Sequence, residues 1–333
     1  MGFALSTAAS SENGRVDILL ATYNGGKYIE ELISSLQNQS YQNWRLIISD
    51  DGSTDDTLEI VRDHARADRR ILEPILHRST GHPKDNFFYL ISLVDASAEY
   101  VAFCDQDDIW MADKLQKLVD EVQGDAPALA FSDLEIIDSC GAMVERSFME
   151  LPSFNPNKLS LSTLMVQNST PGCSMLMNRK LYDLVVIPSV TSEIEMHDWW
   201  IMLIAATFGD IKFINEPLIK YRRHSENASG ELKQSLIKGI ATITEVFNSH
   251  SRAQMQSLQF YVTYKELLDR KEKELLCSYG LLLSQSRLGR IRTVNTNCFW
   301  RISSISARCA QLMYLLYAKR RSVAELISKC SAN

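Results

Sequence analysis

Three apolar runs that each end in polar or acidic residues constrain the fold of this sequence more than any other feature. In chain order, the runs and their endings are Val16–Ala21 with Thr22-Tyr23-Asn24, Leu46–Ser49 with Asp50-Asp51-Gly52-Ser53, and Tyr100–Cys104 with Asp105-Gln106-Asp107-Asp108. Apolar residues at helical spacing separate the runs, and this alternation is typical of a largely parallel sheet flanked by helices. Because the carboxyl ends of parallel strands meet at one edge of a sheet, we expect the three endings to lie together.

The remaining elements follow from the same periodicity. We expect helices over residues 28–36, 86–94, 114–122 and 197–208, and further strands over residues 71–76, 128–132, 173–177, 211–214 and 218–221. Ser53 and Asp56 have the spacing of a capping box, which predicts the start of another helix. The higher content of Pro, Ser and Asn between Leu151 and Gly172 indicates a loop-rich region.

Charge is distributed unevenly along the 333 residues. Residues 1–230 hold 19 Lys and Arg against 34 Asp and Glu, a net charge of -15, whereas residues 231–333 hold 16 against 7, a net charge of +9; the two add up to the overall -6. The second part contains no proline and has helical periodicity throughout. We therefore predict a flexible tail over residues 1–14, an α/β domain over residues 15–230 and a basic helical module over residues 231–333.

Composition and segment length exclude several protein classes. With 45% apolar and 23% charged residues, the chain is neither collagen-like nor wholly disordered. Its longest nearly apolar stretch, Trp199–Phe208, is about half of the ~20 residues that a membrane-spanning helix needs. The sequence begins without the features of a secretory signal, and its seven cysteines are scattered without a paired motif. We therefore expect reduced thiols and a cytoplasmic protein.

The acidic ending at residues 105–108 indicates a cation site. Capping a helix or a turn needs one carboxylate, the role that we expect for Asp55, Asp56 and Asp113, whereas here three carboxylates fall within four positions. Carboxylates held close together repel one another unless a cation lies among them, and oxygen ligands suit Mg²⁺ or Mn²⁺. The sequence lacks the glycine-rich phosphate loops of other nucleotide-binding folds, so we predict that a diphosphate binds through the metal.

These segments resemble the successive motifs of glycosyltransferase family 2. The matching segments are Ile18–Gly25 (ILLATYNG), Ser49–Asp55 (SDDGSTD) and Phe103–Trp110 (FCDQDDIW). The resemblance covers about residues 15–228. It implies the GT-A fold, a Rossmann-like α/β domain with a mostly parallel sheet that binds a nucleotide sugar and carries a D-x-D metal motif.

The resemblance also implies roles for individual residues. Those expected to bind the nucleotide sugar are Thr22, Tyr23, Asn24, Asp51, Asn86, Asp105 and Gly172. Asp51 would accept a hydrogen bond from the pyrimidine N3–H, and Asp107 would ligate the divalent cation. Asn86 departs from the basic residue that the family often has there. Gly172 would let the backbone approach the donor sugar closely.

Asp198, in the segment Met196–Trp200, is the candidate general base. The family's catalytic acidic residue precedes a helix in the same way, and a carboxylate can remove the proton of an acceptor hydroxyl as it attacks the anomeric carbon. One base without a carboxylate nucleophile fits a single displacement with inversion. The alternative for Asp198 is a helix N-cap. Trp199 offers a flat face to the acceptor sugar or, alternatively, belongs to the core.

The segment Tyr221–Gly230 (YRRHSENASG) resembles one that closes many bacterial members of the family, including rhamnosyltransferases. There His224 would be a ligand of the metal or the diphosphate, the alternative being a structural histidine. The resemblance therefore implies a metal-dependent, inverting, rhamnosyltransferase-like enzyme of bacterial surface polysaccharide synthesis, such as O-antigen or capsule. Its donor would be dTDP-L-rhamnose or a UDP-sugar, and its acceptor a saccharide or a lipid-linked saccharide.

Two other functions are open to the same fold. A non-catalytic nucleotide-sugar-binding or scaffold protein could retain the motifs without turnover. A phosphohydrolase with a carboxylate nucleophile would need a companion pattern of Thr or Val and Lys, which the sequence does not show.

Basic and apolar residues alternate between Arg287 and Arg321. Tryptophan and leucine among bases are typical of a helix that lies on an anionic lipid surface, which predicts a peripheral contact with the inner face of the cell membrane. A homo-oligomer interface or a cover for the core is the alternative use of these helices. We expect no nucleic acid partner, because the α/β part is strongly acidic.

Overall fold

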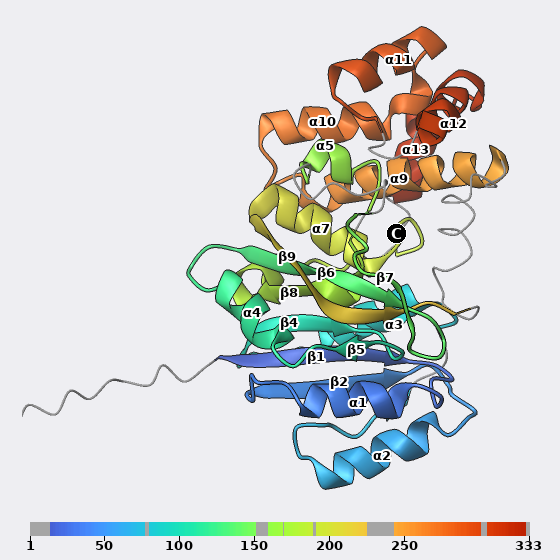
Figure 1. The fold of residues 1–333 in the computed structure, drawn as a ribbon. Coiled ribbons are helices and arrows are strands. Elements are labelled where there is room, and N and C mark those ends of the chain that lie inside the picture. Colours follow the sequence, from blue (N-terminus) through green and yellow to red (C-terminus); the bar gives the residue numbers. More distant parts are fainter. Residues whose placement is uncertain are drawn as a thin grey trace, which may run out of the picture.

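The computed structural model describes residues 14–76, 80–150, 159–168, 170–188, 191–224, 243–300 and 305–330. One mixed sheet forms the centre of the molecule, with α1 (Ile29–Gln37) and α2 (Thr57–Ala67) on one side and α7 (His197–Phe208) on the other (Figure 1). The strand order is β3-β2-β1-β4-β8-β6-β9-β5, with β7 paired to β6. This is the predicted GT-A type of α/β fold, followed by carboxyl-terminal helices.

The first four strands of this order are parallel, as predicted. The strands are β1 (Arg15–Thr22), β2 (Trp44–Asp50), β3 (Ile75–Leu76), β4 (Ala98–Cys104), β5 (Ile109–Trp110), β6 (Ala128–Ile137), β7 (Met143–Glu145), β8 (Met175–Asn178) and β9 (Asp210–Arg222). Beyond β4 the sheet is mixed, because β8 runs antiparallel to both β4 and β6 while β6 and β9 are parallel. The two strands expected over 211–221 form the single strand β9, whose pairing with β6 shifts register after Ser132.

The predicted helices of the α/β part are present with small shifts at their ends. They also include α3 (Pro83–Ser92), α4 (Lys114–Glu121) and the short α5 (Leu161–Leu164) and α6 (Arg179–Tyr182), with a 3₁₀ turn η1 (Gly172–Ser174). The predicted capping box was wrong. Helix α2 begins at Thr57, whereas the Ser53 hydroxyl donates to the Asp50 carboxylate at 2.6 Å and belongs to the turn after β2.

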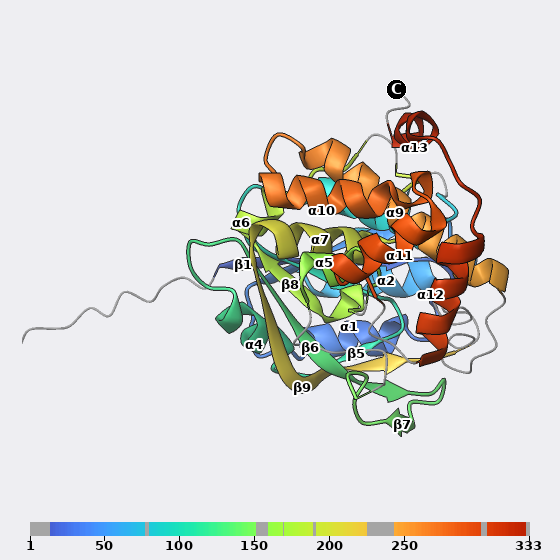
Figure 2. The same ribbon diagram turned by 90° about the horizontal axis from the view of Figure 1, so that it is seen from above.

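The carboxyl-terminal part is helical, as predicted. Its elements are α9 (Ile243–Tyr264), α10 (Arg270–Gly280), η2 (Leu282–Ser284), α11 (Arg287–Thr296), α12 (Ile305–Tyr317) and α13 (Val323–Cys330). Helix α9 covers α7, and the other helices lie beyond it (Figures 1 and 2). The predicted boundary near residue 230, and the tail up to residue 13, lie outside the described residues.

Aromatic packing joins the helical module to the α/β part. Phe260 and Tyr264 of α9 pack against Trp200 of α7, with ring centroids 5.2 and 6.1 Å away. The Tyr264 hydroxyl also donates to the Leu184 carbonyl and accepts from the Val186 amide, both at 2.9 Å. One continuous hydrophobic core therefore extends from the sheet into the module.

Two expectations about the chain as a whole can be compared with this fold. The cysteines that the structure describes are free thiols, as the scattered spacing predicts. In the described part of the chain, every helix is too short or too polar to cross a bilayer.

Candidate active site

The endings of β1 and β2 are joined by a short network of hydrogen bonds. Thr22 and Asp50 are register partners in the parallel ladder, and the Thr22 hydroxyl donates to the Asp50 carboxylate at 2.8 Å. The other Asp50 oxygen accepts the amides of Gly52 and Ser53, and Gly52 has a φ of 95° that favours glycine. Asp50 thus shapes the turn that presents its neighbour Asp51.

Tyr23 and Asn24 extend from the end of β1. The Tyr23 ring is 56% exposed, while its backbone amide and carbonyl are both bonded to the side-chain amide of Gln106, at 2.8 and 2.9 Å. Asn24 has a left-handed φ of 47°, and its side-chain oxygen accepts the Thr54 amide at 2.8 Å. These contacts tie the β1 ending to the β2 and β4 endings, so the three lie together as predicted.

Asp51 directly follows β2, whereas Asn86 lies in α3. The Asp51 carboxylate accepts the backbone amides of Thr80 and Gly81, at 2.5 and 3.0 Å, and so holds the segment that leads into α3. Asn86 is buried in α3, and its amide donates to the Ser49 carbonyl of β2 at 3.0 Å. Asn86 therefore supports the strand that carries Asp51.

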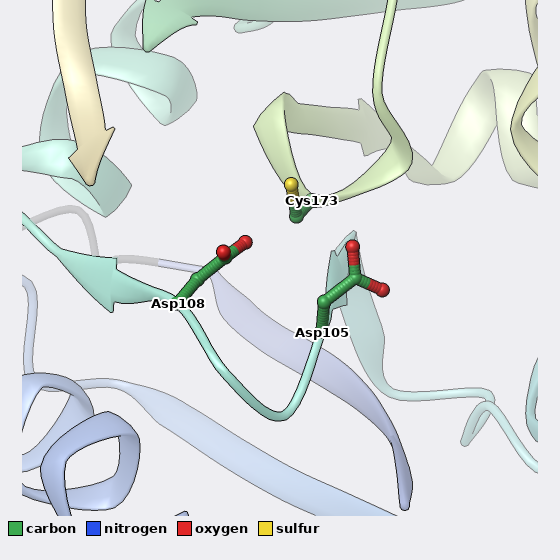
Figure 3. A group of neighbouring side chains, drawn as sticks. All are labelled: Asp105, Asp108 and Cys173. Carbon is green, nitrogen blue, oxygen red and sulfur yellow. The ribbon is translucent and has the colours of Figure 1, made fainter. Parts of the chain in front are cut away.

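Carboxylates converge where β4 ends. Asp105 follows β4, Asp108 precedes β5, and both point toward Cys173 in η1 (Figure 3). One ligand atom from each of these three residues lies within 4.8 Å of the others. Burial, with the negative charges of Asp107 and Asp198, raises the pKa of Asp105 to about 7, and burial likewise raises that of Asp108. The site therefore concentrates unfavourable negative charge, which a cation would relieve.

Asp107 and His224 lie side by side. The His224 Nε2 atom is 2.8 Å from the Asp107 carboxylate, although the two residues are 117 positions apart. Arg222 organises the same loop, since its guanidinium donates to the Asp107 carbonyl at 2.9 Å and its amide donates to the Asp108 carboxylate at 3.1 Å. A further contact, from Arg222 to Glu31 at 2.5 Å, anchors this loop to α1.

Asp198 lies in the first turn of α7, and Met196 occupies the N-cap position, so the alternative of an N-cap role was wrong. One Asp198 oxygen accepts the Gly172 amide at 3.2 Å, and its charge acts on Asp105. A Cβ atom on Gly172 would lie 2.9 Å from His197 Nε2 and 3.2 Å from the Asp198 Cβ, so this approach requires glycine. The structure thus brings Asp198 and Gly172 together with residues 105–108, the acidic loop.

Trp199, next to Asp198, is a buried residue of the hydrophobic core. It is only 6% exposed and its indole nitrogen donates to the Leu164 carbonyl at 2.5 Å. The neighbouring His197 stacks on Phe87 with ring centroids 3.9 Å apart, and burial lowers its pKa to about 3. Both residues fix the start of α7 and so the direction of the Asp198 side chain.

Lys114 is a buried residue of the site that the sequence did not indicate. Its ammonium donates to the Cys173 carbonyl at 2.7 Å and lies 3.0 Å from the centroid of the Trp110 ring. Burial lowers the pKa of Lys114 to about 7, against the opposing effect of Asp105 and Asp108. Lys114 thus holds η1, and with it Gly172, beside the carboxylates.

The fold and the acidic edge define a glycosyltransferase domain of the GT-A type. Residues 17–184 match Glycosyl transferase family 2, which is half of the chain, and the chain belongs to that family.

Several curated relatives are similar over most of their length. The dTDP-rhamnosyl transferase RfbG of Shigella flexneri is 29% identical over 226 residues, 63% of this chain and 73% of that protein. The UDP-Glc:alpha-D-GlcNAc-diphosphoundecaprenol beta-1,3-glucosyltransferase WfgD of Escherichia coli is 27% identical over 226 residues, 66% of this chain and 83% of that protein. TuaG of Bacillus subtilis (strain 168), assigned as a teichuronic acid biosynthesis glycosyltransferase, is 27% identical over 210 residues, 62% of this chain and 78% of that protein.

Solved structures are similar at lower identity. S. aureus TarS 1-349 in complex with UDP is 15% identical, with a TM-score of 0.48, over 90% of this chain and 91% of that one. The mannosyltransferase PcManGT from Pyrobaculum calidifontis, in complex with GDP-Man and Mn²⁺, is also 15% identical, with a TM-score of 0.49, over 97% of this chain and 86% of that one.

Proposed function

We propose that this protein is an inverting, divalent-metal-dependent glycosyltransferase of bacterial surface polysaccharide synthesis. It transfers a sugar, preferably L-rhamnose, from a dTDP- or UDP-linked donor to a saccharide carried on a lipid diphosphate. The observation that carries the proposal is the convergence of Asp198 with the acidic loop through the Gly172 amide. The relatives RfbG and WfgD support the choice of donors and acceptor.

The donor would lie along the edge where β1, β2 and β4 end. Tyr23, the exposed aromatic residue there, offers a ring to the base, with Thr22 and Asn24 shaping its loop. Asp51 would accept a hydrogen bond from the base and keep its two backbone donors, since each carboxylate oxygen can accept more than one hydrogen bond. Asn86 would act through β2, not by contact with the donor.

The acidic loop fits a divalent cation. Its ligands would be carboxylate oxygens of Asp107 and Asp105, as Mg²⁺ and Mn²⁺ prefer. His224 would be either a further ligand or the partner that orients Asp107. One buried Asp108 oxygen has no hydrogen-bond partner among the described residues, which also favours a positive ion nearby. When bound, the metal would stabilise the negative charge of the leaving diphosphate.

Asp198 would act as the general base. Its carboxylate is fixed by the Gly172 and Trp199 amides, at 3.2 and 2.6 Å, in the first turn of α7. It would accept the proton of the acceptor hydroxyl while that oxygen attacks the anomeric carbon and the bond to the diphosphate breaks. One displacement of this kind inverts the anomeric configuration. Since Trp199 is buried, we assign it to positioning Asp198 rather than to acceptor binding.

Transfer from a panel of donors tests the proposal. The full chain would be incubated with dTDP-L-rhamnose, UDP-glucose or UDP-GlcNAc and a synthetic GlcNAc-diphosphate lipid, and product and free nucleotide would be measured. We expect Asp198→Asn to lower kcat about 10²–10⁴-fold, with donor affinity within about twofold of the unaltered protein.

A matched control and two contrary outcomes complete this test. Asp183→Asn, which removes an exposed partner of Arg179, should leave turnover unchanged. No turnover by the unaltered protein with any donor would favour the non-catalytic scaffold. Phosphate release without an acceptor would favour a phosphohydrolase.

A further inference from the structure

The second half of the module concentrates positive charge. Residues 281–333 contain nine Lys and Arg and a single acidic residue, Glu325, a net charge of +8. The preceding helices α9 and α10 are nearly balanced in charge. Since the whole of residues 231–333 carries +9, almost all of the basic character of the module belongs to this final segment.

Helix α12 exposes an apolar face within this basic segment. Leu312, Met313 and Tyr317 are 37%, 42% and 63% exposed, whereas Tyr314 and Leu315 on the opposite face are buried. Helical spacing adds the exposed Cys309, the half-buried Leu316 and the exposed Arg320 to the outer face. Bases flank this outer face: Arg308 lies in the first turn of α12, and Lys319 and Arg320 follow its last residue. The Arg320 Nε atom donates to the Ser284 carbonyl at 2.7 Å, and the residue is still exposed.

The part of this segment that fills the core is distinct from that face. Phe299 and Val294 are fully buried, and the buried Arg290 donates to the Leu315 and Ala318 carbonyls at 3.2 and 2.8 Å. Covering the core therefore accounts for one side of α12 and leaves Leu312, Met313 and Tyr317 unexplained.

We propose that the outer face of α12, defined by Leu312, Met313 and Tyr317, docks on an anionic phospholipid bilayer. The apolar side chains would enter the interfacial region while Arg308, Lys319 and Arg320 face lipid phosphates. The attraction of these bases to an anionic membrane surface falls off within a Debye length, so it weakens as salt is added. Positive charge alone would also suit the surface of an acidic protein. The large apolar side chains beside the bases favour a lipid surface instead.

Helix α12 lies at the periphery of the molecule (Figures 1 and 2). Strands β1 and β2 run toward the right of Figure 1, and α12 stands on that side of the molecule in both ribbon views (Figures 1 and 2). The presence of a lipid-linked acceptor at this membrane rests on the proposed function, whereas the docking of α12 on lipid does not.

Binding to vesicles tests the docking without any substrate. The full chain would be floated with phosphatidylglycerol or phosphatidylcholine vesicles at low and high salt. We expect at least tenfold tighter binding to phosphatidylglycerol at low salt and a marked loss at high salt. The variant Leu312→Glu/Met313→Glu should bind at least tenfold more weakly, whereas Leu267→Glu, at a 62%-exposed leucine after α9, should bind like the unaltered protein.

Equal binding to both lipids, no binding, or full binding by the double variant would overturn the docking proposal. A dimer seen by light scattering that the double variant dissociates would also overturn it, in favour of a second copy of the chain. An unchanged melting temperature of the double variant shows that any loss of binding is not unfolding. Because no turnover is measured, failure here is separate from failure of the proposed transferase reaction.

Discussion

Opposite ends of the parallel strands β1 and β4 contain carboxylates in opposite electrostatic situations. Asp17, near the amino end, is fully buried but bonded to two guanidiniums, Arg45 at 2.6 Å and Arg15 at 3.1 Å. At the carboxyl end of the neighbouring strand β4, Asp105 and Asp108 make no ion pair with the described residues and have raised pKa values. We infer that a carboxylate paired with cations of the chain itself is structural. Carboxylates that come together without such a pair indicate a ligand site.

Removing the paired carboxylate should have the largest effect on stability. In Asp17→Asn, Arg15 and Arg45 lose the fully buried carboxylate that pairs with both and keep only the exposed Asp95, so we expect the free energy of unfolding to fall by about 3 kcal/mol. Denaturant unfolding measures this change. The folded variant should keep the donor affinity of the unaltered protein. A large change in affinity without a loss of stability would show that the two ends of the sheet are not distinct.

Removing the buried lysine should have an intermediate effect. In Lys114→Met, the Cys173 carbonyl loses its donor and the carboxylates lose a nearby charge, so we expect a loss of about 2 kcal/mol in stability. Turnover should also fall by about tenfold, since η1 carries the Gly172 amide that holds Asp198.

Lys117 provides the matched control for this lysine. It lies one turn further along α4 and pairs with Asp113 and Glu216, both at 2.6 Å, on the surface. Lys117→Met should cost less than about 1 kcal/mol and leave turnover unchanged. Equal effects of the two lysine variants would remove Lys114 from the site.

The smallest effect is expected at the half-buried ion pair of Asp68 and Arg70, just after α2. A hydrogen bond and ion pair with Arg70 lower the pKa of Asp68 to about 2, so its stabilising effect is complete above the unfolded-state pKa of about 4 and disappears as pH falls through about 2. Asp68→Asn should cost about 1 kcal/mol at neutral pH and flatten the dependence of stability on pH between about 4 and 2. Acid titrations of unfolding measure both. An unaltered slope would show that this pair does not contribute.

The sequence was informative where local patterns determine structure. The polar endings of three strands were sufficient to predict the shared edge that holds Thr22, Asp51 and Asp105, because parallel strands impose that arrangement. The antiparallel course of β8 was not predictable, since an apolar run of four residues has no direction.

Residues that act through distant contacts were also missed. Gln106 holds the Tyr23 backbone across 83 positions, and Arg222 reaches Glu31 across 191. Lys114 looked like an ordinary first residue of an amphipathic helix, although its ammonium is fully buried. Such roles depend on the completed fold, so neither spacing nor composition indicates them.

Manganese binding tests the central claim most directly, namely that the acidic loop holds a divalent cation. Free Mn²⁺ would be measured by electron paramagnetic resonance as it is titrated into the full chain with UDP or dTDP present. The account predicts one bound ion per chain, at least tenfold weaker binding by Asp107→Asn, and undiminished binding by folded Asp17→Asn. Equal Mn²⁺ affinity of Asp107→Asn and the unaltered protein, or no binding by the unaltered protein, would contradict it.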